Sequence, residues 1–438
     1  MPPGKRENNW IDGLRGIACF IVVTGHLCSS FAPWLHSPVV VEGGPAHVFQ
    51  LPFFRFCVGE RAAVALFFFI TGYVNALNPL KKLREGNLED ALTSLSKSTF
   101  NRTGRLVVPT DAAIFFAWLV CQTNAHRLAS RIDAWWIRGG THEPGPTVWE
   151  SIIRLCRNLT MFWHTGASEY DGTHWTIPFF LKGSMLVYLA VLGTTLTGLR
   201  YRKAIIVFLY LWAWSGGGAL MEMNVYAGMF LAELTADYGP RATSVLPKYA
   251  PSLIILLGLY ISSFPEENPD WMPWSHHINL FAGQFIPAGG ELSRYVVSVG
   301  TTIVVYGVFF SHTARRILSH PFMNFIGRVS FPVYLLHNTL MRTVLAWLIY
   351  WRSAMSADDL NAVDEAGNPI LLERGGPMTF FFGIPAFYVI LYAFAHFWTE
   401  HVDSRCMRFV AWMQRKAFGE EEPVVEKRGI LNGTAIAV

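Results

Sequence analysis

The sequence predicts an all-α, polytopic integral membrane protein with about ten transmembrane helices and both termini in the cytoplasm. Hydrophobic residues make up 52% of the chain and charged residues only 15%, whereas a soluble domain carries roughly 25% charged residues. The charged residues cluster between long apolar runs, and a helix needs about 20 apolar residues to cross the hydrocarbon core. Length therefore supports membrane-spanning helices, although periodicity alone does not separate a buried helix from a buried strand.

Ten apolar segments are the candidate spans. The sixth is short and is crowded by Glu222, Glu233 and Asp237, so the total carries an uncertainty of about one span. In chain order the segments are 14–33, 62–78, 106–124, 183–199, 204–220, 224–236, 250–264, 295–311, 330–351 and 378–398.

Lys and Arg residues indicate the orientation, because the cytoplasmic loops of membrane proteins are enriched in them. With ten spans, the most basic loops fall on one side together with both chain ends, and the opposite loops hold fewer basic residues. We therefore expect a cytoplasmic N-terminal tail at 1–9, a membrane domain at 10–400 and a cytoplasmic C-terminal tail at 401–438. The first of these segments lacks a small-residue cleavage pattern, so no removable signal peptide is expected.

The longest loop on the opposite side covers residues 125–178. Within it, apolar residues recur at helical spacing with polar residues between them, which predicts an amphipathic helix in the membrane interface. The apolar positions are Val148, Ile152, Leu155, Leu159 and Phe162, and the interfacial tryptophans expected beside them are Trp135, Trp136, Trp149 and Trp163.

The first span carries the most informative polar residues. Arg15 and His26 are eleven positions apart, which is about three helical turns, so they share one helix face and lie about 16 Å apart along the axis. Asp12 lies one turn before Arg15 and is expected to pair with it. Ionisable groups at membrane depth are costly and usually face a cavity or a partner. His26 is therefore a candidate catalytic residue, with a plain hydrogen bond to a neighbouring helix as the alternative.

Arg102 and Arg105 enter the third span from the cytoplasm, just before Pro109. They are one turn apart and can point together at an anion. The alternative is that they only anchor the helix end, as basic residues on the cytoplasmic side commonly do. Because Arg15 is expected at the same depth, the three arginines predict a phosphate-binding ring above a channel that leads to His26.

Three further segments hold polar or small residues of interest. Glu60 begins the second span, in which Gly72 permits close helix packing. His174 precedes the fourth span, where an interfacial anchor is the simplest role. His337 lies about two turns inside the ninth span, and we interpret it first as a structural contact. Asp12, His174 and His337 are accessory candidates for a site around His26.

Taken in order, these segments resemble the membrane acyltransferase 3 family, whose members O-acylate sugars and small molecules. The resemblance runs from Trp10 to Trp398 and looks closest to the fungal branch. In that family the arginine and histidine of the first span and the arginine pair of the third span are functional. The resemblance therefore implies catalytic roles for His26 and Arg15 and cofactor-binding roles for Arg15, Arg102 and Arg105. It is carried by DGLRG at 12–16 with His26, FFFITGY at 67–73, Arg102 and Arg105 with Pro109, WTIP at 175–178 with GSM at 183–185, and the stretch 330–337.

One position departs from the family pattern. Members commonly place a glutamate two residues after the proline of the WTIP block, and this chain has Phe180 there. No acidic helper is therefore expected from the fourth span. Residues beyond 400 are too few for an appended catalytic domain, which favours a small-molecule acceptor.

The resemblance implies transfer of a short acyl group, with acetyl preferred, from acyl-coenzyme A to a hydroxyl. Acyl-coenzyme A would be a donor substrate, and no permanently bound cofactor is expected. The coenzyme A phosphates would pair with Arg15, Arg102 and Arg105. His26 would act as the general base, because an imidazole titrates near neutral pH.

The expected partners are the lipid bilayer and a small lipophilic acceptor, such as a fungal secondary metabolite, or a glycolipid. The endoplasmic reticulum or another endomembrane is the expected location. The six cysteines form no C-x-x-C pair, so no metal is expected, and a net charge of +4 does not suggest nucleic acid. The alternative function is a transporter or flippase of a lipid or small solute, because polar residues inside a bundle also mark solute paths.

Overall fold

The computed structural model describes residues 9–356, 362–367 and 369–419. Within these residues the chain is built from helices and loops, and the only β-pairing is two isolated bridges. The predicted all-α class is therefore confirmed. The α-helices are α1 (Asn9–Phe31), α2 (Glu60–Arg84), α3 (Leu88–Gln122), α4 (Trp135–Gly139), α5 (Val148–Thr165), α6 (Thr176–Gly193), α7 (Leu199–Ser215), α8 (Glu222–Tyr238), α9 (Ala250–Ser262), α10 (Pro273–Gly283), α11 (Leu292–Phe310), α12 (His312–Leu318), α13 (Pro321–Arg328), α14 (Ser330–Leu340), α15 (Ala346–Ser356), α16 (Pro377–Trp398) and α17 (Ser404–Phe418).

Six helical stretches in the described part of the chain are long and apolar enough to cross a membrane, and they lie in α1, α2, α3, α6, α11 and the run from α16 to α17. The chain is therefore a polytopic membrane protein, as predicted. The other four predicted spans correspond to the shorter helices α7, α8 and α9 and to α14 with α15. The total of ten spans stays a prediction, as does the cytoplasmic location of both termini.

Several helix boundaries differ from the predicted ones. The fourth span was expected at 183–199, but α6 begins at Thr176 and ends at Gly193. Lys182 interrupts the apolar run in the sequence, yet its ammonium lies on the exposed side of the helix, 3.5 Å from a carboxylate oxygen of Glu222. The third span was expected to begin at 106, whereas α3 begins at Leu88 because its polar first half packs against α17.

The boundary expected at residue 400 falls inside one continuous helical run. A π-helical turn, Thr399–Asp403, joins α16 to α17 without a break. Of the N-terminal tail expected at 1–9, only Asn9 lies within the described residues, and 420–438 lie outside them.

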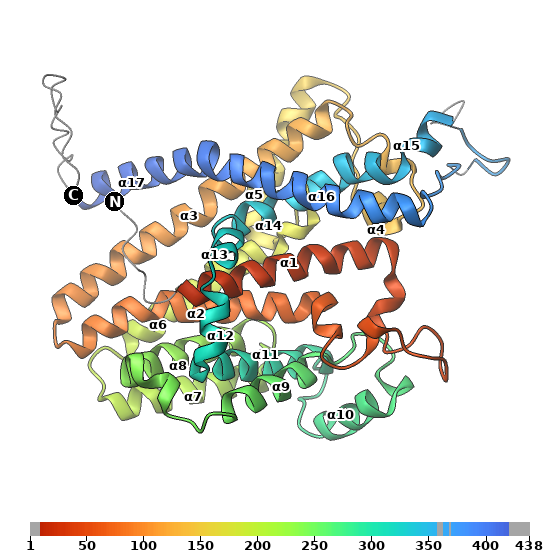
Figure 1. Ribbon diagram of the computed structural model, residues 1–438. Helices are drawn as coiled ribbons and strands as arrows, with labels where there is room; N and C mark the ends of the chain where they lie inside the picture. Colours follow the sequence, from red (N-terminus) through yellow and green to blue (C-terminus); the bar gives the residue numbers. More distant parts are fainter. Residues whose placement is uncertain (1–8, 357–361, 368, 420–438) are drawn as a thin grey trace, which may run out of the picture.

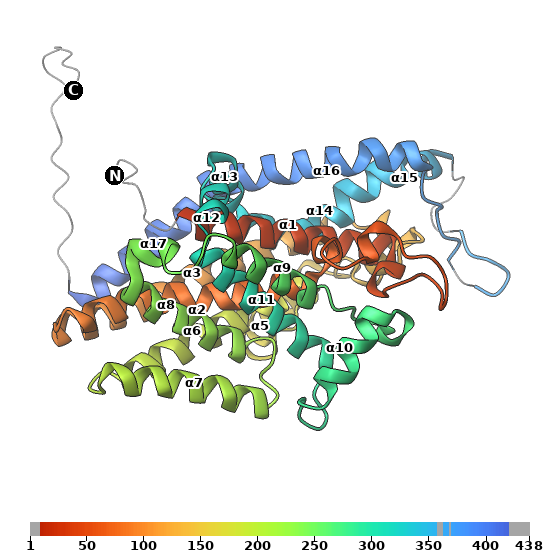
Figure 2. The ribbon, with the colours of Figure 1, turned by 60° about the horizontal axis from the view of Figure 1, so that its bottom comes forward.

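The second helix occupies the centre of the molecule. It packs against α1, α3, α6, α8 and α11, and both views show α1 and α2 lying between α16 on one side and α7 on the other (Figures 1 and 2). A Cβ atom on Gly72 would overlap the carbonyl oxygen of Val225 in α8. The predicted packing role of Gly72 is therefore confirmed.

The acidic residues that crowd the sixth predicted span are paired with basic residues. Glu233 is fully buried and forms ion pairs with Arg84 of α2 and Arg202 of α7. Asp237 pairs with Arg84, at 2.7 Å, and with Lys203. Removing one partner of a buried ion pair is strongly destabilising, so these contacts tie α2, α7 and α8 together.

The predicted amphipathic helix is present as α5, but it buries a different face. Val148 and Ile152 of the predicted apolar face are exposed, whereas Ser151 and Asn158 are buried together with Leu155 and Phe162. The cause is the contact of α5 with α3, where the indole of Trp118 donates to the hydroxyl oxygen of Ser151 at 2.9 Å.

Candidate active site

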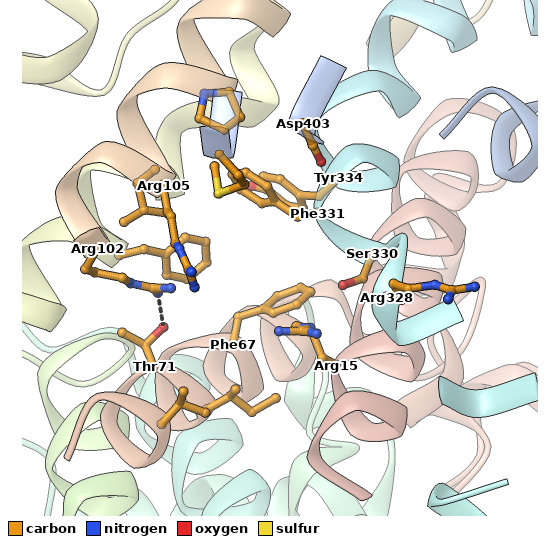
Figure 3. Close-up of a pocket in the computed structure, with 16 residues that line it drawn as sticks. Arg15, Phe67, Thr71, Arg102, Arg105, Arg328, Ser330, Phe331, Tyr334 and Asp403 are labelled. Atoms are coloured by element: carbon orange, nitrogen blue, oxygen red, sulfur yellow. Dashed lines mark hydrogen bonds between the residues drawn. The ribbon is translucent and has the colours of Figure 1, made fainter. Parts of the chain in front are cut away.

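Four arginines surround one cavity of about 370 Å³. Arg15, Arg102 and Arg105, which were expected to converge, all line it, and Arg328 completes the set. Figure 3 shows Arg102 and Arg105 on one wall and Arg15 and Arg328 on the other, with the ring of Phe67 between them. The expected convergence of the three predicted arginines is therefore confirmed.

Both ends of the described chain contribute to this cavity. Arg15 belongs to the first turns of α1, whereas Asp403 and Met407 lie at the junction of α16 and α17. An even number of membrane crossings between these segments would produce this arrangement.

The arginines differ in how far their charge is neutralised. Arg15 pairs with Asp12 at 2.8 Å, as expected, and its Nε donates to the carbonyl oxygen of Gly327 at 3.2 Å. Arg102 donates only to hydroxyl oxygens, of Ser184 at 3.1 Å and of Thr71 at 3.5 Å. In the part of the chain that is described, no carboxylate lies within ion-pair distance of Arg102. Its charge is therefore available to an anion in the cavity.

Arg328 was not predicted as a site residue. In the sequence it is one more basic residue in a loop predicted to be cytoplasmic, which the orientation rule already explains. Its position depends on the tight crossing of α1 and α13, where a Cβ atom on Gly16 would lie 2.7 Å from the backbone nitrogen of Gly327. This crossing places Arg328 opposite Arg102, so the cavity is more basic than predicted.

His26 is held between two aromatic rings. Its ring stacks on Trp136 with centroids 4.5 Å apart and on His337 with centroids 5.2 Å apart. Its Nδ1 lies 3.1 Å from Oε2 of Glu60, and the side chain is 14% exposed. Gly25 makes room for this contact, because a Cβ atom there would lie 2.8 Å from the Cβ of Glu60.

The contact with Glu60 determines which nitrogen of His26 can act as a base. A carboxylate at Nδ1 favours the tautomer with the proton on that atom, which leaves Nε2 unprotonated. Nδ1 is buried, so the exposed part of the ring lies elsewhere. The arrangement can therefore accept a proton on Nε2 and stabilise the resulting cation through Glu60.

A short run of α14 connects the arginine cavity with His26. Tyr334 lines the cavity, and its ring lies 5.9 Å from that of His337. The hydroxyl of Tyr334 donates to the carbonyl oxygen of Thr173 at 2.6 Å. His26 does not line the cavity itself but lies beyond Tyr334 and His337.

The role expected for His174 as an interfacial anchor is wrong. His174 is fully buried, and its Nε2 lies 2.8 Å from the carbonyl oxygen of Leu335 and 3.6 Å from the carboxylate of Asp171. The short helix Gly172–Trp175 turns this side chain inward, whereas Trp175 is 40% exposed, as an anchor would be.

Asp171 is the centre of a buried polar cluster at the far end of α14. It accepts hydrogen bonds from the backbone and hydroxyl of Thr173 and from the amide of Asn338. Burial alone would raise the pKa of Asp171, but His174 and Arg342 hold the pKa of this carboxyl well below its usual range. The cluster therefore fixes α14 with its buried histidine next to His26.

Besides Arg328 and His174, three further residues of the site were missed or misassigned from the sequence. Glu60 was noted only as the start of a span, Trp136 was assigned to the membrane interface, and Asp171 lies in no recognised motif. The one available signal concerned Glu60. It is an acidic residue at the membrane depth of His26, and ionisable residues at that depth usually have a partner.

The chain is similar to a known protein family and to several fungal proteins. The acyltransferase domain of the acyltransferase 3 family matches residues 8–396. O-acetyltransferase PaAT-1 of Phomopsis amygdali is 23% identical over 384 residues, which cover 77% of this chain and 73% of that protein. Acyltransferase clz18 of Cochliobolus lunatus is 25% identical over 422 residues, covering 80% and 86% of the two chains.

A third relative, acyltransferase R4 of Phoma sp., is 23% identical over 432 residues, covering 83% of this chain and 89% of that protein. No solved structure matches the chain. The family match spans most of the sequence and includes His26 and the four arginines of the cavity. The protein is therefore a membrane acyltransferase and belongs to the acyltransferase 3 family.

Proposed function

We propose that the protein transfers a short acyl group, preferably acetyl, from acyl-coenzyme A to a hydroxyl of a small lipophilic acceptor. The observation that carries this proposal is the convergence of four arginines on one cavity beside the buried histidine pair. Guanidinium groups bind phosphate oxygens through paired, charge-assisted hydrogen bonds. Coenzyme A presents a diphosphate and a 3′-phosphate, which suit arginines on two opposite walls.

The donor would enter from the arginine cavity and extend along α1. Its phosphates would contact Arg15, Arg102, Arg105 and Arg328, and its pantetheine arm would pass Tyr334. Arg15 and His26 lie about 16 Å apart along the helix axis, and the extended arm would cover this distance. The thioester would then lie beside His26.

The reaction at His26 is a general-base acyl transfer. Nε2 of His26 accepts the proton of the acceptor hydroxyl while its oxygen attacks the thioester carbonyl carbon. The carbon–sulfur bond then breaks, and the thiolate of coenzyme A takes the proton back from the imidazolium. Glu60 stabilises the imidazolium between these two steps, because its Oε2 lies 3.1 Å from Nδ1.

The related proteins support the acetyl donor and the hydroxyl acceptor. The relative from Phomopsis amygdali carries the name O-acetyltransferase, and all three relatives come from fungi. A fungal secondary metabolite is the acceptor class that we propose on this basis. The endoplasmic reticulum is the location that we propose for a multi-pass chain of this kind.

Thiol release from acetyl-coenzyme A in extracted membranes tests the proposed function. Membranes that contain the wild-type protein should release coenzyme A thiol, and membranes with equal amounts of the His26→Ala protein should not. No release with any acceptor supplied would remove the basis for acyl-coenzyme A as the donor, whereas equal release by both proteins would remove the assignment of His26 as the base.

A further inference from the structure

His337 has one nitrogen fixed by the backbone and one nitrogen without a partner. The side chain is fully buried, and its Nδ1 lies 2.7 Å from the carbonyl oxygen of Tyr334. A carbonyl oxygen can only accept a hydrogen bond, so Nδ1 carries the proton. In the neutral ring Nε2 is then a bare acceptor.

No described residue donates a hydrogen bond to Nε2 of His337, and this atom is shielded from solvent. Buried polar atoms in folded proteins are nearly always paired. Two residues further along the chain also have an unpaired buried atom each: Oδ1 of Asn338, which cannot donate, and Nε of Arg342, whose guanidinium donates through Nη1 to the carbonyl oxygen of Tyr170 at 2.8 Å. Nε2 of His337 is therefore free to accept a hydrogen bond from a group outside the described residues.

The position of His337 places such a group beside the catalytic base. The rings of His26 and His337 are nearly parallel, with an angle of 4° between their planes and centroids 5.2 Å apart. An alcohol hydroxyl has a single hydrogen, and in the proposed reaction this hydrogen goes to His26. The same hydroxyl cannot also supply the donor that His337 requires.

We propose that His337 binds the acceptor by accepting a hydrogen bond from a second donor group, an O–H or N–H close to the acylated hydroxyl. The acceptor class is then a 1,2-diol, a 1,3-diol or an amino alcohol rather than a simple alcohol. This inference rests on the proposed function, because it takes His26 as the base. Because Nε2 of His337 carries no proton, it cannot donate a hydrogen bond to the acceptor. The site therefore selects acceptors that carry a second donor group.

Two matched probes and two matched variants test this proposal. The probes are 1-decanol and 1,2-decanediol, each supplied with radiolabelled acetyl-coenzyme A to the full-length protein in detergent. Wild-type protein should show a KM for the diol about two- to tenfold below that for the simple alcohol, which is the range that one neutral hydrogen bond supplies. Saturation by acetyl-coenzyme A should be the same with both probes.

The variants separate the two nitrogens of His337. His337→Asn keeps a donor near the Tyr334 carbonyl oxygen but lacks an acceptor at the position of Nε2, so it should lose the preference for the diol. His337→Gln reaches the position of Nε2 with an amide oxygen and should retain part of the preference. Saturation by acetyl-coenzyme A should be unchanged in both variants, because His337 does not line the arginine cavity.

The outcomes distinguish this inference from the proposed function. Wild-type protein that acylates both probes equally well, or that releases thiol with neither probe while doing so with another alcohol, would overturn the second-donor contact alone. A diol preference that survives in His337→Asn would also overturn it and would assign Nε2 to a water molecule. Absence of thiol release with every acceptor would instead remove the proposed function.

Discussion

Replacement of Arg102 should weaken donor binding more than replacement of Arg15. Arg102 contacts only the hydroxyls of Ser184 and Thr71, so no carboxylate offsets its charge among the described residues. A charge-assisted hydrogen bond contributes about 1.5–3 kcal/mol, which corresponds to roughly tenfold to a hundredfold in binding. Arg102→Met should therefore raise the KM for acetyl-coenzyme A by about this factor and leave the KM for the acceptor unchanged.

The effect at Arg15 should be smaller, because Asp12 already neutralises part of its charge at 2.8 Å. The assay is thiol release at varied acetyl-coenzyme A with a fixed acceptor, normalised to the amount of monodisperse protein. Arg102→Lys keeps a charge and should recover part of the affinity. Arg316→Met is the matched control, since Arg316 is an exposed arginine outside the cavity. If Arg102→Met and Arg316→Met saturate alike, the arginines of α3 are membrane anchors and the phosphate site is wrong.

Three other changes have defined outcomes. Glu60→Gln removes the carboxylate beside Nδ1 of His26 and should lower kcat by about tenfold to a hundredfold with the KM for acetyl-coenzyme A unchanged, and an unchanged kcat would separate the two residues functionally. Burial, together with Arg342, lowers the pKa of His126 to about 4, so protons bind the unfolded chain first as the pH falls below about 6.5. The free energy of unfolding in detergent should therefore be highest above pH 6.5 and should fall towards pH 4 by up to about 3 kcal/mol. His126→Gln should flatten this pH profile. Tags at both termini should be digested in sealed microsomes while a tag at Gly140 is protected, and termini of opposite accessibility would indicate an odd number of spans.

The fold class followed from properties that the sequence displays directly. Long apolar runs and clustered charges predicted a helical membrane protein, and each predicted span has a helix in the structure. The boundaries were less accurate where polar residues belong to helices that leave the apolar region. The first half of α3 and α17 are examples, because these two helices pack against each other. Hydropathy carries no signal for such contacts.

The candidate site was predictable where its residues share a helix or a helix end. The spacing of Arg15 and His26 along α1 predicted that they share one helix face. The one-turn spacing of Arg102 and Arg105 on α3 predicted that they point the same way. Glu60 and Trp136 reach His26 from other segments, across a gap that only the folded chain closes. Local spacing cannot reveal such pairs, and the interfacial preference of tryptophan gave Trp136 a sufficient but different explanation.

The histidine at position 174 shows a further limit of sequence reasoning. Position next to a span predicted an anchor, and the neighbouring Trp175 behaves as one. His174 instead lies buried against Asp171 and Leu335, because a short helical turn reverses the side-chain direction between adjacent residues. Hydropathy is averaged over many residues, so it cannot show that two adjacent side chains point in opposite directions.

The turnover of His26→Ala tests the central claim most directly. A general base contributes about 10²–10⁴-fold to the rate, so acetyl transfer by this variant should fall by that factor at saturating donor and acceptor. Binding of coenzyme A should remain, because the four arginines lie in a cavity that His26 does not line. The comparison requires equal amounts of folded protein, measured by gel filtration in detergent. Near-normal turnover of His26→Ala at equal folded protein would contradict the assignment of His26 as the base.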